Sequence, residues 1–270
     1  MGYAENELYA STWREMADTP VTSRLRCEYV QRVRSWIEQV ARHTKFARIN
    51  VVAFSMGVPL ARKAITGGWC VDGAVHLGGS LGVRVQTLVA VAGANQGWTH
   101  CGAAPVPLTI CDPVNGFYVD FRSPDCDGSA SAASRFLRDV DGGDANDVAA
   151  AVYTIWSRAD RVIRPSICMR HSGRIRGQRA EWVSRNMSHV EILLQTTHRQ
   201  VEMLRLGEPN RRLAPKPSKP AKPAALQQPV PGCPVHLAAF CSGTSSFIRT
   251  IQRIVDDSAK AFAPTGQFLG

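Results

Sequence analysis

The sequence lacks an apolar run long enough to cross a membrane, and it lacks a cysteine spacing typical of a metal site. A transmembrane helix needs about 18 or more apolar residues, whereas the longest apolar stretches here, 49–54 and 88–93, have the length of a β-strand. No two cysteines stand in C-x-x-C spacing, so a structural zinc site is not predicted. The first ten residues also lack the basic start and apolar centre of a signal peptide.

Cysteine itself is plentiful and dispersed along the chain. An even number of cysteines favours disulfide bonds and an oxidising compartment, although the sequence does not reveal their pairing. The eight are Cys27, Cys70, Cys101, Cys111, Cys126, Cys168, Cys233 and Cys241. Secreted proteins normally begin with a signal peptide. The cysteines therefore indicate secretion, whereas the start of the chain does not. We therefore expect that the N-terminal part of the protein is missing from this chain.

Basic residues outnumber acidic ones, and the excess lies late in the chain. The formal net charge is +10, and between residues 158 and 222 fifteen arginines and lysines stand against five acidic residues. Such a tract favours a solvated basic surface, and it is compatible with association with an anionic lipid surface. It carries no nucleic-acid-binding motif, so we predict no specific nucleic-acid partner, and binding through charge alone is the weakest of the alternatives.

Hydrophobic patterning predicts strands that alternate with helices. Short apolar runs predict strands over 7–13, 47–54, 85–92, 152–156 and 179–184. Apolar residues at three- and four-residue steps predict helices over 23–44, 55–65, 131–140 and 189–206. This alternation is typical of the α/β class, in which a parallel sheet has helices on both faces.

Composition divides the chain into three parts. Residues 1–207 carry the alternating α/β pattern and are predicted to form one domain. Residues 208–231 are rich in proline and lysine, which predicts an extended, disordered linker. Residues 232–270 are predicted to be a C-terminal extension with one short amphipathic helix.

The most informative motif joins a predicted strand to a predicted helix, and it reads Val51-Val52-Ala53-Phe54-Ser55-Met56-Gly57. In a nucleophile elbow, a tight turn after a strand exposes a serine at the N-terminus of the following helix. Small residues on either side, here Ala53 and Gly57, are expected to let strand and helix approach closely. The backbone N–H of Met56 would then stabilise an oxyanion. The alternative role of Ser55 is that of an ordinary helix N-cap.

A nucleophilic serine needs a base, and the base needs an acid that orients it, in the chain order serine, acid, histidine. Asp160 follows a buried strand, and His189 stands directly before the apolar turn of the last helix. The sequence therefore predicts Ser55, Asp160 and His189 as a catalytic triad. His171 and His198 are rivals, but no helix opens after the first and the second lies inside one. A surface ion pair with an arginine is the alternative role of Asp160.

Residues 3–206 resemble the class 2 lipases, which are small secreted α/β-hydrolases. That family likewise carries Ala-x-Ser-Met-Gly at its elbow. The other matching segments are Val89-Ala90-Val91-Ala92-Gly93-Ala94-Asn95, Tyr153-Thr154-Ile155-Trp156-Ser157-Arg158-Ala159-Asp160 and Ser188-His189-Val190-Glu191-Ile192-Leu193-Leu194. Segments around Cys70, Cys111 and Cys126 resemble the larger animal members of the family. One departure is Phe54, which stands where these lipases often have histidine.

The resemblance implies an α/β-hydrolase fold and an extracellular lipase or carboxylesterase. It implies that Ser55, Asp160 and His189 are the triad and that the Met56 N–H is an oxyanion donor. The substrate would be a lipid or another acyl ester, cleaved through an acyl-serine intermediate, and neither a metal nor an organic cofactor is implied.

In this fold a second oxyanion donor comes from a loop after an earlier strand, and the sequence contains no counterpart of that loop. We therefore expect the chain to lack the N-terminal strand or strands and the oxyanion loop. The alternative function is then a catalytically inactive hydrolase-fold protein, or a truncated gene product without a complete oxyanion hole.

Overall fold

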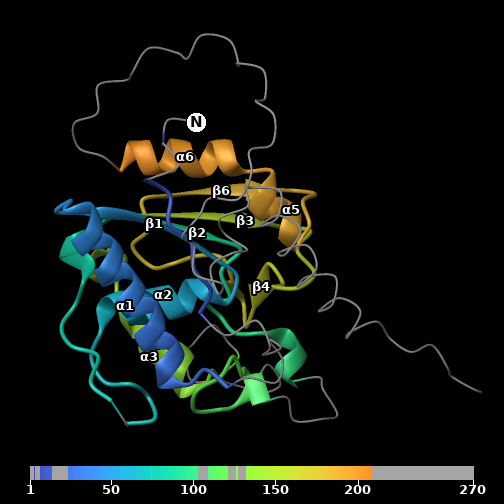
Figure 1. Ribbon diagram of the computed structural model, residues 1–270. Helices are drawn as coiled ribbons and strands as arrows, with labels where there is room; N and C mark the ends of the chain where they lie inside the picture. The colour runs from blue at the N-terminus through green and yellow to red at the C-terminus, as the bar shows by residue number, and fades with distance from the viewer. Residues whose placement is uncertain are drawn as a thin grey trace, which may run out of the picture. The chain divides into compact units, whose positions relative to one another are not determined.

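The computed structural model in Figure 1 describes residue 3 and the ranges 7–13, 24–73, 75–102, 109–120, 126 and 132–207. The predicted linker over 208–231 and the predicted extension over 232–270 lie outside the described residues. Among the helices that are described, none is both long and apolar enough to cross a membrane.

Four parallel strands form the central sheet, in the order β1-β2-β3-β6. Their bounds are β1 Ile49–Phe54, β2 Val85–Val91, β3 Ala151–Ser157 and β6 Ala180–Ser184. Each corresponds to a predicted strand, with ends that differ by no more than a few residues. Strands β2 and β3 are apolar nearly throughout because helices cover both of their faces. The predicted α/β-hydrolase class is confirmed.

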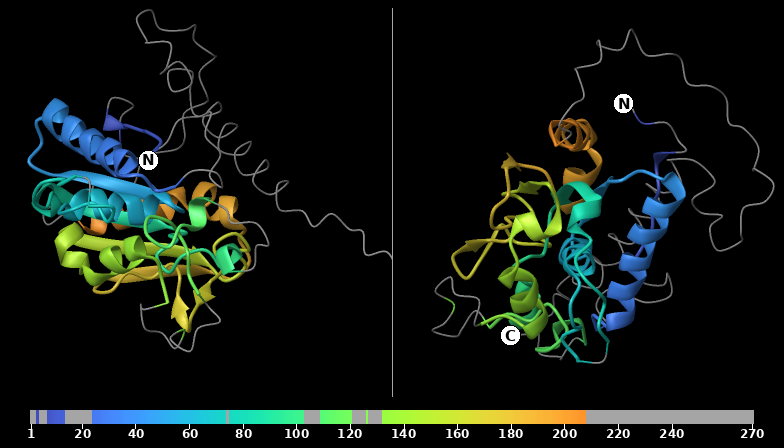
Figure 2. Two further views of the ribbon diagram at one scale, coloured as in Figure 1. Left: turned by 90° about the horizontal axis from the view of Figure 1, so that it is seen from below. Right: turned by 90° about the vertical axis from the view of Figure 1, so that its left-hand side faces the viewer.

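Helices lie on both faces of the sheet, as Figures 1 and 2 show. Successive residues of a strand point to opposite faces, so a buried strand contributes side chains to two apolar clusters. Leu88 of β2 belongs to the cluster that includes Ile37 from α1 (Cys27–Thr44) and Ile65 from α2 (Gly57–Thr66). Val89, the next residue, belongs to the cluster that includes Ile192 from α5 (His189–Leu194) and Met203 and Leu204 from α6 (Thr197–Leu206).

Strand β1 is the edge of the described sheet, and it is less buried than predicted. Among the described strands it pairs only with β2, and its Val52 is 44% exposed. The prediction of a strand over 7–13 is wrong, because Glu7 lies in a 3₁₀ turn and residues 8–13 form no strand. A strand needs a neighbouring strand to pair with, and no described strand pairs with these residues. The N-terminal residues contact β1 through side chains instead, since the Asn50 amide donates to the Tyr3 hydroxyl at 3.3 Å.

Two short helices lie between β2 and β3, namely α3 (Arg135–Gly142) and α4 (Ala145–Val148). Helix α3 starts later than the predicted residue 131 because Ser134 caps it. The Ser134 hydroxyl oxygen accepts a hydrogen bond from the Leu137 N–H at 3.2 Å. Asp144 and Asp147 form a capping box at the start of α4.

The helix predicted over 189–206 is two helices, α5 and α6, separated at Gln195 and Thr196. The Thr196 hydroxyl donates to the carbonyl oxygen of Ile192, four residues earlier. The Gln200 amide donates to the Leu193 carbonyl oxygen at 2.7 Å, so it satisfies another carbonyl left open by the break. Side-chain hydrogen bonds of this kind compete with the helical ladder. The apolar spacing runs through the break, which is why the pattern did not reveal it.

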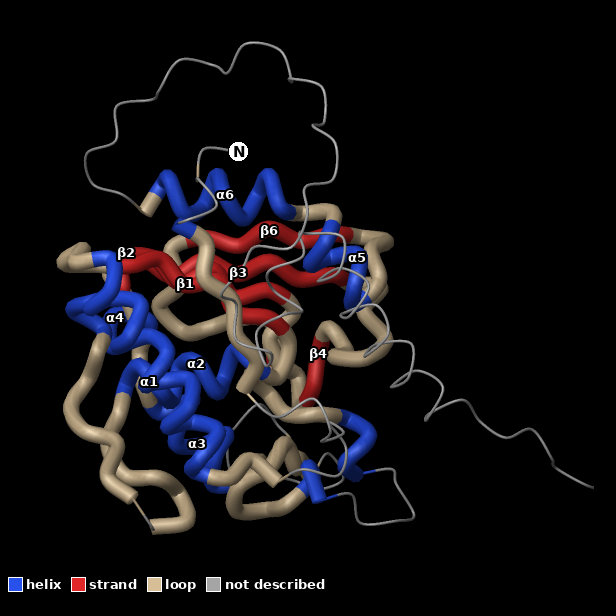
Figure 3. The backbone as a smooth tube through the Cα atoms, viewed as in Figure 1, coloured by secondary structure: helices blue, strands red, loops and turns tan. Residues whose placement is uncertain are grey.

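A two-stranded hairpin, β4 (Ser166–Ile167) and β5 (Arg170–His171), follows the loop after β3 and was not predicted. Short 3₁₀ turns lie over Gly82–Arg84, Thr99–Gly102 and Thr109–Cys111. Figure 3 shows how much of the chain below the sheet is loop. Three disulfides fasten these loops, namely Cys27–Cys70, Cys101–Cys111 and Cys126–Cys168. The prediction of disulfide bonds is thus confirmed for six of the eight cysteines, and Cys233 and Cys241 lie outside the described residues.

Candidate active site

The turn between β1 and α2 has the backbone of a nucleophile elbow. Strand β1 ends at Phe54, Ser55 has a φ of 55°, and α2 begins two residues later at Gly57. A left-handed backbone costs a residue with a side chain about 1–2 kcal/mol. Two hydrogen bonds help to hold it, because the Ser55 carbonyl oxygen accepts from the Val58 N–H at 3.1 Å and from the Ala94 N–H at 3.3 Å. This turn leaves the Ser55 side chain half-buried at the carboxyl end of the sheet.

The close approach of strand and helix that was expected at Gly57 occurs at another glycine. A Cβ atom on Gly57 would meet only the Trp13 ring, at an ordinary contact distance of 3.9 Å. On Gly93, just after β2, a Cβ atom would lie 2.7 Å from the Asn95 amide nitrogen and 3.0 Å from a Val58 methyl group. The sequence expectation about Gly57 is therefore wrong, and Gly93 is the glycine that lets β2 approach the first turn of α2.

Met56 is the N-cap of α2, and its N–H donates to no described residue. The first N–H groups of a helix have no partner inside the helix, and the helix dipole adds partial positive charge at the same end. The N–H of Met56 follows Ser55 directly. This position is where a donor must lie to stabilise an anion that forms on a carbonyl attacked by Ser55.

Asp160 is buried and firmly held. It is 4% exposed, and its Oδ1 accepts hydrogen bonds from the backbone N–H groups of Val162 and Ile163, both at 2.9 Å. The Trp98 indole N–H donates to the Val162 carbonyl oxygen at 3.0 Å and so braces the same turn. No ion pair joins Asp160 to an arginine within the described residues, so the alternative of a surface ion pair is wrong.

His189 bridges the other two predicted residues. Its Nδ1 lies 2.7 Å from Asp160 Oδ2, and its Nε2 lies 2.8 Å from Ser55 Oγ. A carboxylate only accepts hydrogen bonds, so the proton belongs on Nδ1 and Nε2 is left to accept from the serine hydroxyl. Ser55 lies between a strand and a helix, Asp160 lies in the loop between β3 and β4, and His189 is the first residue of α5. The structure thus brings together all three residues that the sequence predicts.

The rival histidines lie elsewhere. His171 is exposed on β5, where its ring lies 5.1 Å from the Trp156 ring centroid. His198 lies in the first turn of α6. Neither makes a hydrogen bond to Ser55 or Asp160.

A comparison with known protein families identifies a match. The model of the family described as lipase (class 2) matches residues 1–202. The chain belongs to the class 2 lipase family. A search of the curated proteins found no match. Membership of this family supports a lipase or esterase function and an acyl-ester substrate.

In this member of the class 2 lipase family a capping box fixes the backbone of His189. The Ser188 hydroxyl oxygen accepts from the Glu191 N–H at 3.4 Å, and the Glu191 carboxylate accepts from the Ser188 N–H at 2.8 Å. The hydrogen bond from the Ser188 backbone is the main reason why the pKa of Glu191 is lowered. The Ser-x-x-Glu spacing is a sign of a helix start that can be read from a sequence.

Replacing Ser188 with alanine is expected to lower the free energy of unfolding by about 1 kcal/mol, the usual cost of losing an N-cap. A lower kcat should accompany the loss of stability, because the backbone that carries His189 is no longer fixed. Thermal unfolding and ester hydrolysis measure the two effects. Ser134→Ala is the matched control, since it removes the N-cap of α3, far along the chain from His189. Unchanged activity in Ser188→Ala would show that the cap has no positioning role.

Phe54 is a contact of the histidine that sequence reasoning missed. Its ring centroid lies 4.7 Å from that of His189, with the planes tilted by 35°. The Phe54 ring covers one side of the imidazole. The hydrogen bonds to Asp160 and Ser55 fix the orientation of the imidazole within its own plane. The sequence marked Phe54 only as a departure from the family, and nothing in the pattern showed which side chain it touches.

A buried arginine connects the elbow helix to neighbouring loops. Arg62 of α2 is 1% exposed, and it donates to Asn95 Oδ1 and to the Val140 carbonyl oxygen, both at 3.0 Å. Burial lowers the pKa of the guanidinium to about 10. The Asn95 amide in turn donates to the Ser172 carbonyl oxygen at 3.2 Å. This chain of hydrogen bonds joins α2 to the segments that follow β2 and β5.

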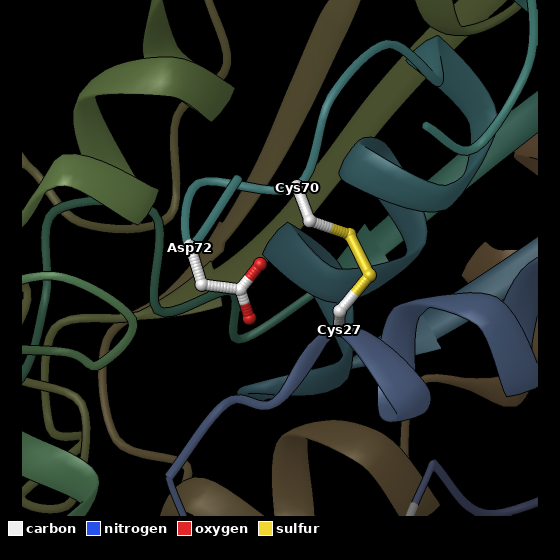
Figure 4. A group of neighbouring side chains, drawn as sticks. All are labelled: Cys27, Cys70 and Asp72. Atoms are coloured by element: carbon white, nitrogen blue, oxygen red, sulfur yellow. A yellow bond between two sulfur atoms is a disulfide. The ribbon is translucent and has the colours of Figure 1, made fainter. Parts of the chain in front are cut away.

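One group of side chains has the composition of a metal site, but its sulfurs are already bonded. Figure 4 shows Cys27, Cys70 and Asp72 together, and the yellow bond joins the two cysteines. A metal ion binds cysteine as the thiolate, and a disulfide offers none. In its oxidised form this group is therefore a covalent fastening between α1 and the loop after α2.

Proposed function

We propose that this protein is a lipase or carboxylesterase that hydrolyses acyl esters through a Ser55–His189–Asp160 triad. The observation that carries the proposal is the continuous contact from Ser55 Oγ through the His189 ring to Asp160, at 2.8 Å and 2.7 Å. Burial of His189 and Asp160 supports it, because electrostatic interactions are stronger away from water. The family match supports the same class of reaction.

The proposed reaction has two steps. In the first, His189 Nε2 takes the hydroxyl proton as Ser55 Oγ attacks the ester carbonyl carbon, and Asp160 stabilises the imidazolium. The Met56 N–H stabilises the oxyanion, and His189 then protonates the alcohol that leaves. In the second step, His189 takes a proton from water as the water attacks the acyl-serine, and it returns that proton to Ser55 Oγ as the carboxylic acid leaves.

We also propose that the protein acts outside the cell. Three disulfides and membership of a lipase family suggest an extracellular protein. The family resemblance implies that the substrates are acyl esters of lipids, and the protein would encounter such lipids outside the cell.

Hydrolysis of a short, water-soluble p-nitrophenyl ester by the purified chain tests the proposal. Turnover well above the rate in buffer, abolished by a fluorophosphonate reagent, is the expected result. A folded sample with no turnover above the buffer rate would instead support the alternative of an inactive hydrolase-fold protein. Circular dichroism and a cooperative thermal transition show that the sample is folded.

A further inference from the structure

Two neighbouring loops at the carboxyl edge of the sheet carry exposed arginines. The loop over 158–165 follows β3 and contains Asp160, and the loop over 185–188 follows β6 and leads to His189. They adjoin, because the Arg158 N–H donates to the Ser184 carbonyl oxygen at 2.9 Å. Their exposed arginines, which we call the arginine rim, are Arg158, Arg161, Arg164 and Arg185.

The charge of the arginine rim is not neutralised by described acidic residues. None of its members forms an ion pair within the described part of the chain, whereas other arginines do, such as Arg170 with Asp141 at 2.6 Å. Asp160 in the first loop is buried and bonded to His189. Glu191, just beyond the second loop, uses its carboxylate to accept from the Ser188 N–H. Over the described residues of these two loops and Glu191, four arginines stand against two carboxylates, so this part of the edge has a net positive charge.

One neighbouring group responds to this charge. The pKa of His100 is lowered, first by partial burial and second by the nearby positive charge of Arg164. His100 lies in the 3₁₀ turn that follows β2, where its ring contacts that of Trp98 at 4.7 Å. Arg164 therefore lies close enough to the segment after β2 for its charge to act there.

An exposed apolar side chain stands at the tip of the hairpin that follows the rim. Met169 lies between β4 and β5, and it is 83% exposed, more than any other large hydrophobic residue described. Cys168 and Met169 both have a left-handed backbone, with φ of 47° and 59°. The disulfide from Cys126 to Cys168 fastens this tip. Figure 1 shows β4 below the sheet, towards the side of the view on which α5 lies.

From these observations we infer that the arginine rim and Met169 form a docking surface for an anionic lipid membrane. Unpaired arginines are attracted to the negative headgroups of such a membrane, and the exposed methionine of the hairpin that follows can enter the boundary between headgroups and acyl chains. The inference deepens the proposed function, because a membrane held at this edge presents its acyl esters to Ser55. Binding is nevertheless a property that can be measured without hydrolysis.

Co-sedimentation with lipid vesicles tests the inference. The full chain carrying Ser55→Ala is used, so that binding is measured without turnover and is independent of the proposed reaction. Vesicles of phosphatidylcholine alone are compared with vesicles that also contain about one third phosphatidylglycerol. The expected result is binding to the anionic vesicles only, weakening as salt is added.

A rim variant and a matched control locate the surface. The rim variant carries glutamine at Arg158, Arg161, Arg164 and Arg185. The control removes the same charge at the opposite edge, with glutamine at Lys45, Arg48, Arg84 and Arg179, four exposed residues that precede strands β1, β2 and β6. Because each basic residue near an anionic surface contributes about fivefold in affinity, the rim variant should bind about a hundredfold or more weakly than the control. Met169→Ser should weaken binding several-fold by itself.

Two results would overturn the inference. Equal loss of binding in the rim variant and the control would mean that overall charge, including that of the basic tract after residue 207, attracts the membrane. Release of the chain from vesicles by millimolar glycerol phosphate, at an ionic strength where sodium chloride has no effect, would mean that the rim binds a single phosphate group and not a lipid surface.

Discussion

Ser55→Ala and His189→Ala are each expected to lower kcat for ester hydrolysis by about a millionfold, and the double variant should be no slower than either single one. The two side chains act as one unit, because the serine is a poor nucleophile without a base and the base has no task without the serine. The 2.8 Å contact between His189 Nε2 and Ser55 Oγ is the physical basis for this coupling. Steady-state kinetics on a soluble ester measure all three variants.

The rival histidines provide the controls for this result. His171→Ala and His198→Ala remove the same group from β5 and α6, where neither ring contacts Ser55, and both should keep near-normal kcat. If His189→Ala retained activity, or if the losses of the two single variants multiplied in the double variant, the triad would not be the catalytic unit.

Asp160→Asn is expected to lower kcat by about ten-thousandfold while leaving KM nearly unchanged. An amide in place of the carboxylate can donate to His189 Nδ1, which favours the tautomer with its proton on Nε2 and removes the acceptor for the serine hydroxyl. It also removes the negative charge that stabilises the imidazolium. The hydrogen bonds from Val162 and Ile163 to Oδ1 should survive, so the turn keeps its shape.

Asp141→Asn is the matched control for this change. It also removes a carboxylate that is mostly shielded from solvent, in this case from an ion pair with Arg170, and it should lower stability without lowering kcat. Recovery of the normal kcat at high pH in Asp160→Asn would contradict the assigned role. Raising the pH removes protons from solvent-exposed groups, but it does not restore the His189 tautomer that has its proton on Nδ1.

The sequence revealed most about the positions where a strand ends. Buried parallel strands are continuous apolar runs, so β2 and β3 were predicted nearly to the residue. In a parallel sheet the carboxyl ends of the strands meet at one edge, which is why residues from distant junctions, Ser55, Asp160 and His189, were expected to come together. The elbow motif and the order of the three residues supplied the rest of that prediction.

Features that depend on neighbours distant in sequence were not visible. The run over 7–13 has the composition of a strand, yet no described strand pairs with it. At the break between α5 and α6, the side chains of Thr196 and Gln200 form hydrogen bonds with backbone carbonyl oxygens and not with solvent. The disulfide Cys126–Cys168 joins cysteines 42 residues apart, a pairing that only the folded chain determines. Phe54 gives no sign in sequence that it faces the catalytic ring.

Labelling with a fluorophosphonate, followed by mass spectrometry of the peptides, identifies the nucleophilic residue. Such a reagent reacts with a serine only where a neighbouring base activates it. We expect a single covalent adduct on Ser55 in the folded wild-type chain and none in His189→Ala. An adduct on another residue, or a folded wild-type chain with no adduct, would contradict the proposed triad.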